Sequence, residues 1–296
     1  MRHHGTWLRT LVFRALRLSL LPVLMRETLQ RRTVTLILYH DPEPQRLARH
    51  LRALRRSYTF ISLRRFVDAL REGRLDELPS KALVLTFDDG HIRNRGLHGV
   101  LERLGVPATI FLCSSVVGTG RAFWFHHVPD PQALKPMTDA QRLHHLAARG
   151  FDELREGRPE ALTDEDVRAM QGPVVDFQCH GATHPILVGC DDAKARDEIL
   201  GSRRTLTARY GLDIFAFSYP NGDYSSRELA LVREAGYRCA LTVDEGFNTA
   251  TTDPFALRRI PIDDTDGVCE VMVKASGVLG ALRHLAGLPP PGRGRS

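Results

Sequence analysis

Residues 82–90, with the sequence ALVLTFDDG, decide the fold. Residues 82–87 form a short apolar run of the length of one buried strand, and two carboxylates and a glycine follow directly. The carboxyl ends of strands are where α/β folds hold their sites. Adjacent residues of an extended chain point in different directions, so Asp88 and Asp89 can divide the tasks of moving a proton and holding a metal. Gly90 permits the sharp turn that follows, and a plain solvent-facing turn remains the alternative interpretation.

Similar apolar runs recur along the chain and alternate with amphipathic stretches. This alternation predicts parallel strands joined by crossover helices, hence an α/β barrel or a doubly wound sheet. Thr163 is positioned to cap one of the helices, with Asp166 three residues later. The other strands are expected at 33–39, 108–113, 174–178, 214–217, 239–243 and 257–262, and the other helices at 47–56, 63–71, 97–104, 193–210, 226–235 and 269–285.

Residues 118–162 break the alternation, and we expect a long excursion over one end of the fold. The excursion contains Trp124, followed by His126 and His127. Aromatic faces stack on sugars, so Trp124 is a candidate for lining a sugar site. Packing within the loop explains these side chains equally well.

The first 32 residues are basic, with Glu27 as their one acid. Arginines interrupt the apolar stretch at 8–25, so it resembles neither a cleavable signal peptide nor a spanning helix. We expect a basic amphipathic helix over residues 7–25 that either contacts a membrane peripherally or packs on the barrel. The expected location is cytoplasmic, with or without attachment to the membrane surface. Residues 288–296 are expected to be a disordered tail.

Composition limits the classes of protein to consider. With 296 residues, 43% of them hydrophobic, the chain can bury one large core as a single domain. The net charge of +6 would suit nucleic acid or an anionic membrane, but we find no nucleic-acid motif and expect no nucleic-acid partner. The number of cysteines is odd, five, and they include no CxxC pair, so we do not expect a disulfide framework. This favours a reducing compartment.

A second polar motif, CHGATHP at residues 179–185, also follows an apolar strand. His180 and His184 lie on one face if the segment makes a helical turn, and this spacing suits one divalent metal. Together with a carboxylate at the end of residues 82–87, they provide the ligands of a catalytic zinc-type site that keeps a position open for water.

These motifs resemble those of the polysaccharide deacetylases, the carbohydrate esterase family four group with a NodB-homology domain. The resemblance implies a distorted (β/α) barrel of about seven parallel strands, a single domain over residues 33–287. It rests on TFDDG at 86–90, HGATHP at 180–185, FSYPNG at 217–222, Tyr39-His40 and LRRIP at 257–261, and covers about residues 33–265.

The resemblance also implies roles for individual residues. The activity would be removal of an N-acyl group, typically N-acetyl, from an amino sugar or its polymer by metal-activated water. The metal would be Zn²⁺, with Co²⁺, Ni²⁺ or Mn²⁺ as alternatives. The implied residues are Asp89, His180 and His184 as metal ligands, Asp88 as general base, and Asn221 with Tyr219 and Pro220 in the loop that holds the oxyanion.

The sequence departs from the family pattern at three places. Gly181 stands where the family often has Ser or Thr, and Ser218 where it often has an Arg that orients the base. The late Leu-x-His motif, which supplies the general acid, is not evident. Barrel closure would bring the last strand beside the first, so Arg259 is the candidate for the missing Arg and His40 for the missing acid. A surface Arg and a packed His are the alternatives.

Three functions remain open from the sequence. The departures resemble a branch of the family found with exopolysaccharide biosynthesis. Intact Asp88, Asp89, His180 and His184 favour the first function, an active deacetylase of an N-acetylated amino sugar or its polymer. A deformylase or deacetylase of a lipid-linked or nucleotide-linked sugar keeps the same chemistry. A catalytically inactive, carbohydrate-binding barrel is the third, and metal content would distinguish it from the other two.

Overall fold

A single curled sheet forms the centre of the protein, whose computed structural model describes residues 4–287. Its order is β7-β6-β5-β4-β3-β1-β8, with β2 beside β3, and all neighbouring strands are parallel. The predicted distorted barrel of about seven parallel strands in one domain is therefore confirmed. The strands are β1 (Thr35–Tyr39), β2 (Thr59–Phe60), β3 (Ala82–Phe87), β4 (Ala108–Leu112), β5 (Val175–Cys179), β6 (Ala216–Ser218), β7 (Cys239–Leu241) and β8 (Ile260–Pro261).

The segment that contains β8 contacts both edges of the sheet. Leu257 forms a parallel bridge with Leu241 of β7, and Ile260 pairs with Ile37 of β1. The regular part of this segment is shorter than the strand predicted at 257–262. It nevertheless brings the last strand beside the first, as the barrel hypothesis requires.

The strands β1, β3 and β4 are buried along their whole length, because side chains pack on both faces of the sheet. Along β3, Leu83, Leu85 and Phe87 belong to the larger core under the surrounding helices. Ala82 and Val84 point the other way and pack in a second cluster with Phe66 of α4 (Leu63–Arg71). This alternation decides where the residues after β3 point.

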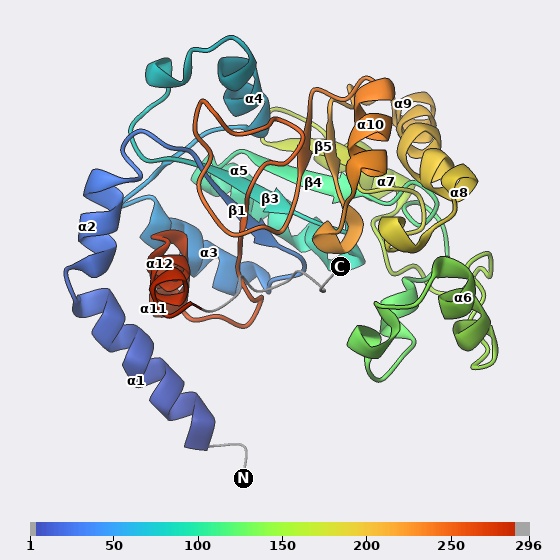
Figure 1. Cartoon of the computed structure of the whole chain (residues 1–296), viewed down its shortest axis with the longest axis horizontal. Helices are drawn as coiled ribbons and strands as arrows, with labels where there is room; N and C mark the ends of the chain where they lie inside the picture. The colour runs from blue at the N-terminus through green and yellow to red at the C-terminus, as the bar shows by residue number, and fades with distance from the viewer. Residues whose placement is uncertain (1–3, 288–296) are drawn as a thin grey trace.

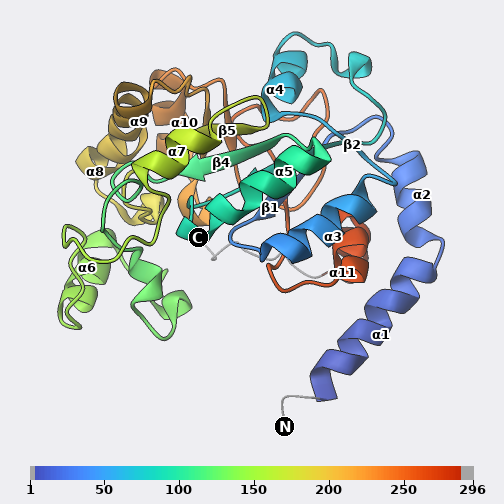
Figure 2. The ribbon, with the colours of Figure 1, turned by 180° about the vertical axis from the view of Figure 1, so that it is seen from behind.

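The helices cover the sheet from outside (Figures 1 and 2). Thr163 caps α7 (Asp164–Met170) in the predicted capping box with Asp166, and Gly105 ends α5 (His98–Leu104) in a left-handed conformation. The helix predicted at 193–210 consists of two helices joined by a π-helical turn at Asp197–Gly201. The helices around the barrel are α3 (Pro44–Leu54), α5 (His98–Leu104), α7 (Asp164–Met170), α8 (Asp192–Arg196), α9 (Ser202–Tyr210), α10 (Ser226–Glu234), α11 (Val268–Ala275) and α12 (Val278–Leu285).

The single helix predicted at 269–285 is wrong, because α11 and α12 are separated at Gly277. Gly277 has a φ of 76°, and a Cβ at this position would lie 2.4 Å from the Phe247 ring. Only glycine fits this close approach without strain. The chain therefore turns here instead of continuing the helix.

The excursion at 118–162 contains α6 (Asp139–Ala147), which stands off from the barrel in Figure 1. It has a small core of its own, in which Trp124, Leu134 and Leu146 pack with Ile186. Since Ile186 follows the HGATHP motif, the excursion borders the end of β5.

Two helices precede the barrel, α1 (His4–Leu18) and α2 (Leu21–Thr28), where one helix was predicted over residues 7–25. Pro22 occupies the start of α2, a position where its missing N–H costs nothing. Arg9 of α1 pairs with Asp266 and with Glu270 of α11, so α1 lies along α11. No described helix is long and apolar enough to cross a membrane. The predicted tail at 288–296 lies outside the described residues.

Candidate active site

Asp88 continues the inward-facing series of β3, which explains its position inside the barrel. Its N–H donates to the Tyr39 carbonyl at 3.0 Å, so the backbone still follows the register of β1 and β3. Its side chain is buried. Gly90 follows with a φ of 66°, and a Cβ there would lie 2.5 Å from a methyl of Leu112. The motif therefore needs glycine at this turn.

Arg259, in the segment that contains β8, donates two hydrogen bonds to the Asp88 carboxylate. Its Nη1 donates to Oδ1 at 2.8 Å and its Nη2 to Oδ2 at 2.7 Å, the two-pronged geometry that only Arg provides. Arg259 is 0% exposed, and its Nε donates to the Thr242 carbonyl. The Ser218 hydroxyl donates to Asp88 Oδ2 at 3.2 Å and accepts from Arg259. The position that departs from the family pattern thus joins the same network.

The network keeps Asp88 ionised. Burial alone would raise the pKa of its carboxyl, but the charge of Arg259, the charge of His180 and the hydrogen bonds from Arg259 act together against burial, and the net pKa lies below its ordinary value. A buried carboxylate that stays ionised near neutral pH is suited to accept a proton.

Asp89, His180 and His184 form a buried cluster whose candidate ligand atoms all lie within 4.8 Å of one another. Asp89 Oδ1 lies 3.4 Å from His180 Nε2 and 3.2 Å from His184 Nε2. His180 Nδ1 donates to the Ser218 carbonyl at 2.8 Å, which fixes the ring and turns Nε2 toward Asp89. Cys179 is not part of the cluster, because its thiol contacts the Ser202 hydroxyl.

The donor set of this cluster fits a divalent cation. Asp89 Oδ1 and His184 Nδ1 are buried and have no hydrogen-bond partner among the described residues. Leaving buried polar atoms unpaired is costly, and a bound cation would relieve that cost at the carboxylate oxygen. Burial lowers the pKa of His184, an effect that Asp89 only partly offsets. His184 is therefore in the neutral form that binds cations.

Three candidate site residues have a left-handed backbone. Asp89 has a φ of 71°, His184 of 60° and Asn221 of 59°, and only one other described residue that is not glycine, Lys81, has a positive φ. Such conformations cost free energy and persist where the surrounding structure enforces them. At Asp89 this left-handed turn directs the carboxylate toward His180 and His184, whereas the carboxylate of Asp88 faces Arg259.

Two aromatic residues of the excursion, Trp124 and Phe125, contact His184 of the cluster. The indole N–H of Trp124 donates to the His184 carbonyl at 2.9 Å, and the Arg142 guanidinium lies over its ring. The Trp124 face is therefore covered instead of being open to a sugar. Phe125 meets the His184 ring edge-on at 4.9 Å, and His91 Nε2 lies 3.1 Å from Asp89 Oδ2.

The loop after β6 brings its residues to different places. Asn221 is half-buried, and its side-chain amide donates to Asp223. Pro220 is buried beside the position of Gly181. Tyr219 is fully buried, and its hydroxyl donates to the Phe255 carbonyl, so its side chain packs in the core and does not face a substrate.

The sequence matches the model of the polysaccharide deacetylase family over residues 76–240, more than half of the chain. The chain belongs to the polysaccharide deacetylase family. It is accordingly a hydrolase that acts on N-acetyl amide bonds, and the family predicted from the motifs is confirmed. No curated protein sequence matches the chain.

Solved structures of deacetylases share the fold. The chain is similar to the Streptococcus pyogenes deacetylase PplD in complex with acetate, with 20% identity and a TM-score of 0.62 over 82% of this chain and 98% of that one. It is similar to IcaB from Ammonifex degensii, with 18% identity and a TM-score of 0.62 over 83% and 98%. It is also similar to the deacetylase domain of BpsB from Bordetella bronchiseptica, with 17% identity and a TM-score of 0.56 over 78% and 96%.

Glu198 accounts for one departure of this polysaccharide deacetylase from the family pattern. Its buried carboxylate accepts from the N–H groups of Ala182 and Thr183 and from the Thr183 hydroxyl. A Cβ at Gly181 would lie 2.9 Å from Glu198 Oε2, so a larger residue would displace this carboxylate. Glu198 could not be recognised from the sequence, because a Glu within an amphipathic helix is typical of an exposed face. The π-helical turn places it against the motif.

His40 lies at the rim of the barrel. Its side chain is exposed, and its backbone is held by Asp264, which accepts from its N–H, and by Asn94, which donates to its carbonyl. His40 is also the last and smallest of the effects that act on the pKa of Asp88, after burial, Arg259 and His180.

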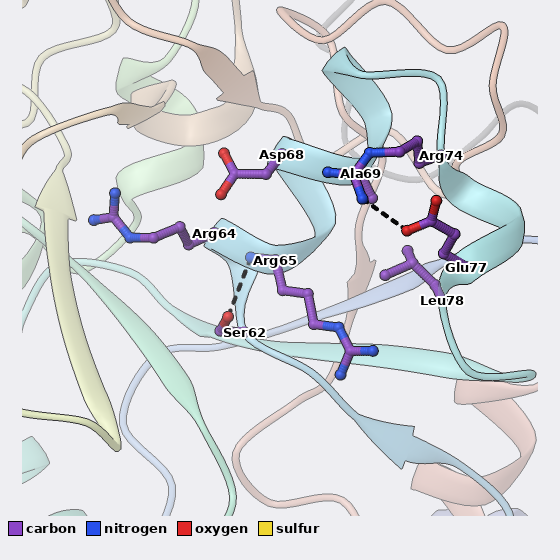
Figure 3. Close-up of a pocket in the computed structure, with 8 residues that line it drawn as sticks. All are labelled: Ser62, Arg64, Arg65, Asp68, Ala69, Arg74, Glu77 and Leu78. Carbon is purple, nitrogen blue, oxygen red and sulfur yellow. Dashed lines mark hydrogen bonds and ion pairs between the residues drawn. The ribbon is translucent and has the colours of Figure 1, made fainter.

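A surface pocket of about 370 Å³ lies elsewhere, along α4 and the segment after it (Figure 3). Two of the arginines that line it are already paired with carboxylates, Arg64 with Asp213 and Arg74 with Glu77. None of the candidate site residues lines it.

Proposed function

We propose that this chain removes the N-acetyl group from an N-acetylated amino sugar or its polymer in a reaction that depends on one divalent metal ion. The observation that carries the proposal is the pairing of two sites at one end of the barrel. One is the ionised Asp88 held by Arg259, and the other is the buried Asp89, His180 and His184 cluster.

Asp88 is the general base in this proposal. A carboxylate offers about four lone-pair sites. Arg259 and Ser218 occupy three of them, two on Oδ2 and one on Oδ1. The free site on Oδ1 takes the proton of the attacking water. The fixed geometry orients the base without any rearrangement during the reaction.

Asp89, His180 and His184 would hold the metal, with Zn²⁺ as the expected ion and Co²⁺, Ni²⁺ or Mn²⁺ as alternatives. Such an ion supplies Lewis acidity, which polarises the acyl carbonyl and lowers the pKa of water. Glu198 and Trp124 keep the backbone of the motif in place through the bonds described above. His91 orients the Asp89 carboxylate.

The remaining roles belong to the loop after β6 and to the rim. The backbone N–H of Asn221 is assigned to the developing oxyanion, and its strained conformation sets the direction of that group. His40 is assigned as the acid that protonates the leaving amine, because it is exposed at the rim and interacts with Asp88. The contacts of Arg259 with Asp88 support Arg259 as the substitute for the missing family Arg, which argues against the inactive-barrel alternative.

Acetate release from short N-acetylglucosamine oligomers tests this proposal. We expect about one acetate and one free amine per cleaved amide, loss of activity after chelation, and recovery on adding Zn²⁺ or Co²⁺. The matched control is the same chelation followed by Mg²⁺, an ion that binds poorly to His ligands and should not restore activity. Undiminished turnover in chelator would contradict the metal dependence. Reconstituted protein that acts on no acetylated sugar would contradict the substrate class.

A further inference from the structure

The two N-terminal helices expose most of the large apolar side chains on the surface. Of the fourteen exposed large hydrophobic residues among those described, ten lie between Trp7 and Leu29. Leu18 is 85% exposed and Trp7 54%. Two others, Leu282 and Leu285, lie on α12, which contacts α2. Scattered apolar residues are ordinary on a surface, but a concentration on one small element marks an interaction site.

The exposed residues of α1 occupy one side of the helix. At about 100° per residue, Leu8, Leu11, Val12 and Leu18 fall within an arc of roughly 120°. Phe13 and Leu16 point elsewhere and are half-buried, on the side where Arg9 meets α11. The helix thus has one face for the barrel and a second apolar face with no described neighbour, and Figure 1 shows α1 extending away from the body of the protein. Pro22 of α2 is buried and does not belong to this apolar face.

Positive charge flanks this apolar face. The first 32 residues contain seven arginines and one acid. Arg14 and Arg17 are exposed along α1, and Arg31 and Arg32 are exposed just after α2. A helix with Trp and Leu on one face and Arg beside it is typical of segments that lie in the interface of an anionic bilayer.

A second copy of the chain fits this surface less well. In a two-fold dimer the same patch meets itself, so the arginines of one α1 would approach those of the other. Glu27 alone could compensate them from residues 1–32, and it already pairs with Lys81. In an anionic lipid surface the acyl chains bury the apolar face, and the headgroups attract the arginines.

We propose that the apolar face of α1 and α2, with its flanking arginines, docks the protein on the surface of an anionic membrane. Arg9 links α1 to Asp266, and Asp264 in the same loop holds the backbone of His40 at the rim of the site. Docking therefore orients the mouth of the barrel relative to the lipid surface.

Vesicle co-sedimentation of the full chain tests the proposal. The probes are vesicles of phosphatidylcholine alone and vesicles that also contain about 30% phosphatidylglycerol. We expect binding to the anionic vesicles and a decrease in binding as salt is raised. The Leu11→Glu/Leu18→Glu variant should partition about tenfold more weakly or worse, because two apolar anchors become charged. Both residues are exposed, so the fold should survive, which circular dichroism checks.

The matched control is Leu154→Glu/Val188→Glu, which alters two exposed apolar residues outside this face and should bind like wild type. Trp7 adds a second readout, because the only other Trp, Trp124, is buried. Its emission should shift to the blue on anionic vesicles. The proposal is overturned if folded wild type ignores anionic vesicles or if Leu11→Glu/Leu18→Glu binds them equally well. A dimer in solution that this variant dissociates, without vesicle binding, would also overturn it.

Discussion

Asp88→Asn is expected to lower kcat by about 10²- to 10⁴-fold while the chain still binds one divalent metal ion. The amide keeps the shape of the carboxylate but cannot accept the proton of water. Asp89 and the two histidines are unchanged, so metal binding should persist. Acetate release and metal analysis on the same preparation measure both quantities.

Asp88→Asn also leaves Arg259 buried without its anionic partner, so stability must be measured alongside activity. Asp76→Asn is the matched control, because Asp76 is exposed and precedes β3, at the end of that strand opposite to Asp88. It should leave kcat and the melting temperature unchanged. A folded, metal-loaded Asp88→Asn chain that turns over at more than about a tenth of the wild-type rate would remove Asp88 from the role of base.

Arg259→Met should damage both stability and activity. Removing one partner of a buried ion pair typically costs 3–5 kcal/mol of unfolding free energy, about the value we expect here. The pKa of Asp88 should rise, because burial raises it and the opposing guanidinium is gone. A smaller fraction of Asp88 is then ionised at any given pH. The acid limb of the kcat/KM profile should therefore move to higher pH, and denaturant unfolding measures the loss of stability.

Two further variants separate positioning from charge. Arg259→Lys should restore the positive charge but not the two-pronged bond, and so should move the acid limb only part of the way back. Arg258→Met alters the exposed neighbour and should change neither quantity. An acid limb that does not move in Arg259→Met would show that Arg259 does not control the protonation of Asp88.

The fold was predictable because its signals are local. The strands β1, β3 and β4 are mostly apolar runs, and the two aspartates of the TFDDG motif stand at the end of β3. Barrel closure then suggested Arg259 as a neighbour of the first strands, with an arginine exposed on the surface as the alternative interpretation. The contact between Arg259 and Asp88 depends on Leu257 and Ile260 bonding to opposite edges of the sheet.

Features that depend on tertiary contacts could not be predicted. The break at Gly277 arises from the Phe247 ring, which is distant in sequence. The strand β2 has two residues, too few to show a pattern. Glu198 reaches the HGATHP motif through a π-helical turn, and Trp124 turns its N–H to His184 instead of presenting its face to a sugar. Each of these outcomes is decided by packing.

Zn²⁺ titration of the metal-free chain by calorimetry tests whether Asp89, His180 and His184 form a metal site. We expect about one site per wild-type chain, and little or no binding in His184→Ala, because a three-ligand site loses one ligand. His144→Ala is the control, since His144 is exposed on α6, outside the cluster, and should bind like wild type. A wild-type chain that binds no divalent metal ion, or a His184→Ala chain that binds as tightly as wild type, would contradict the account.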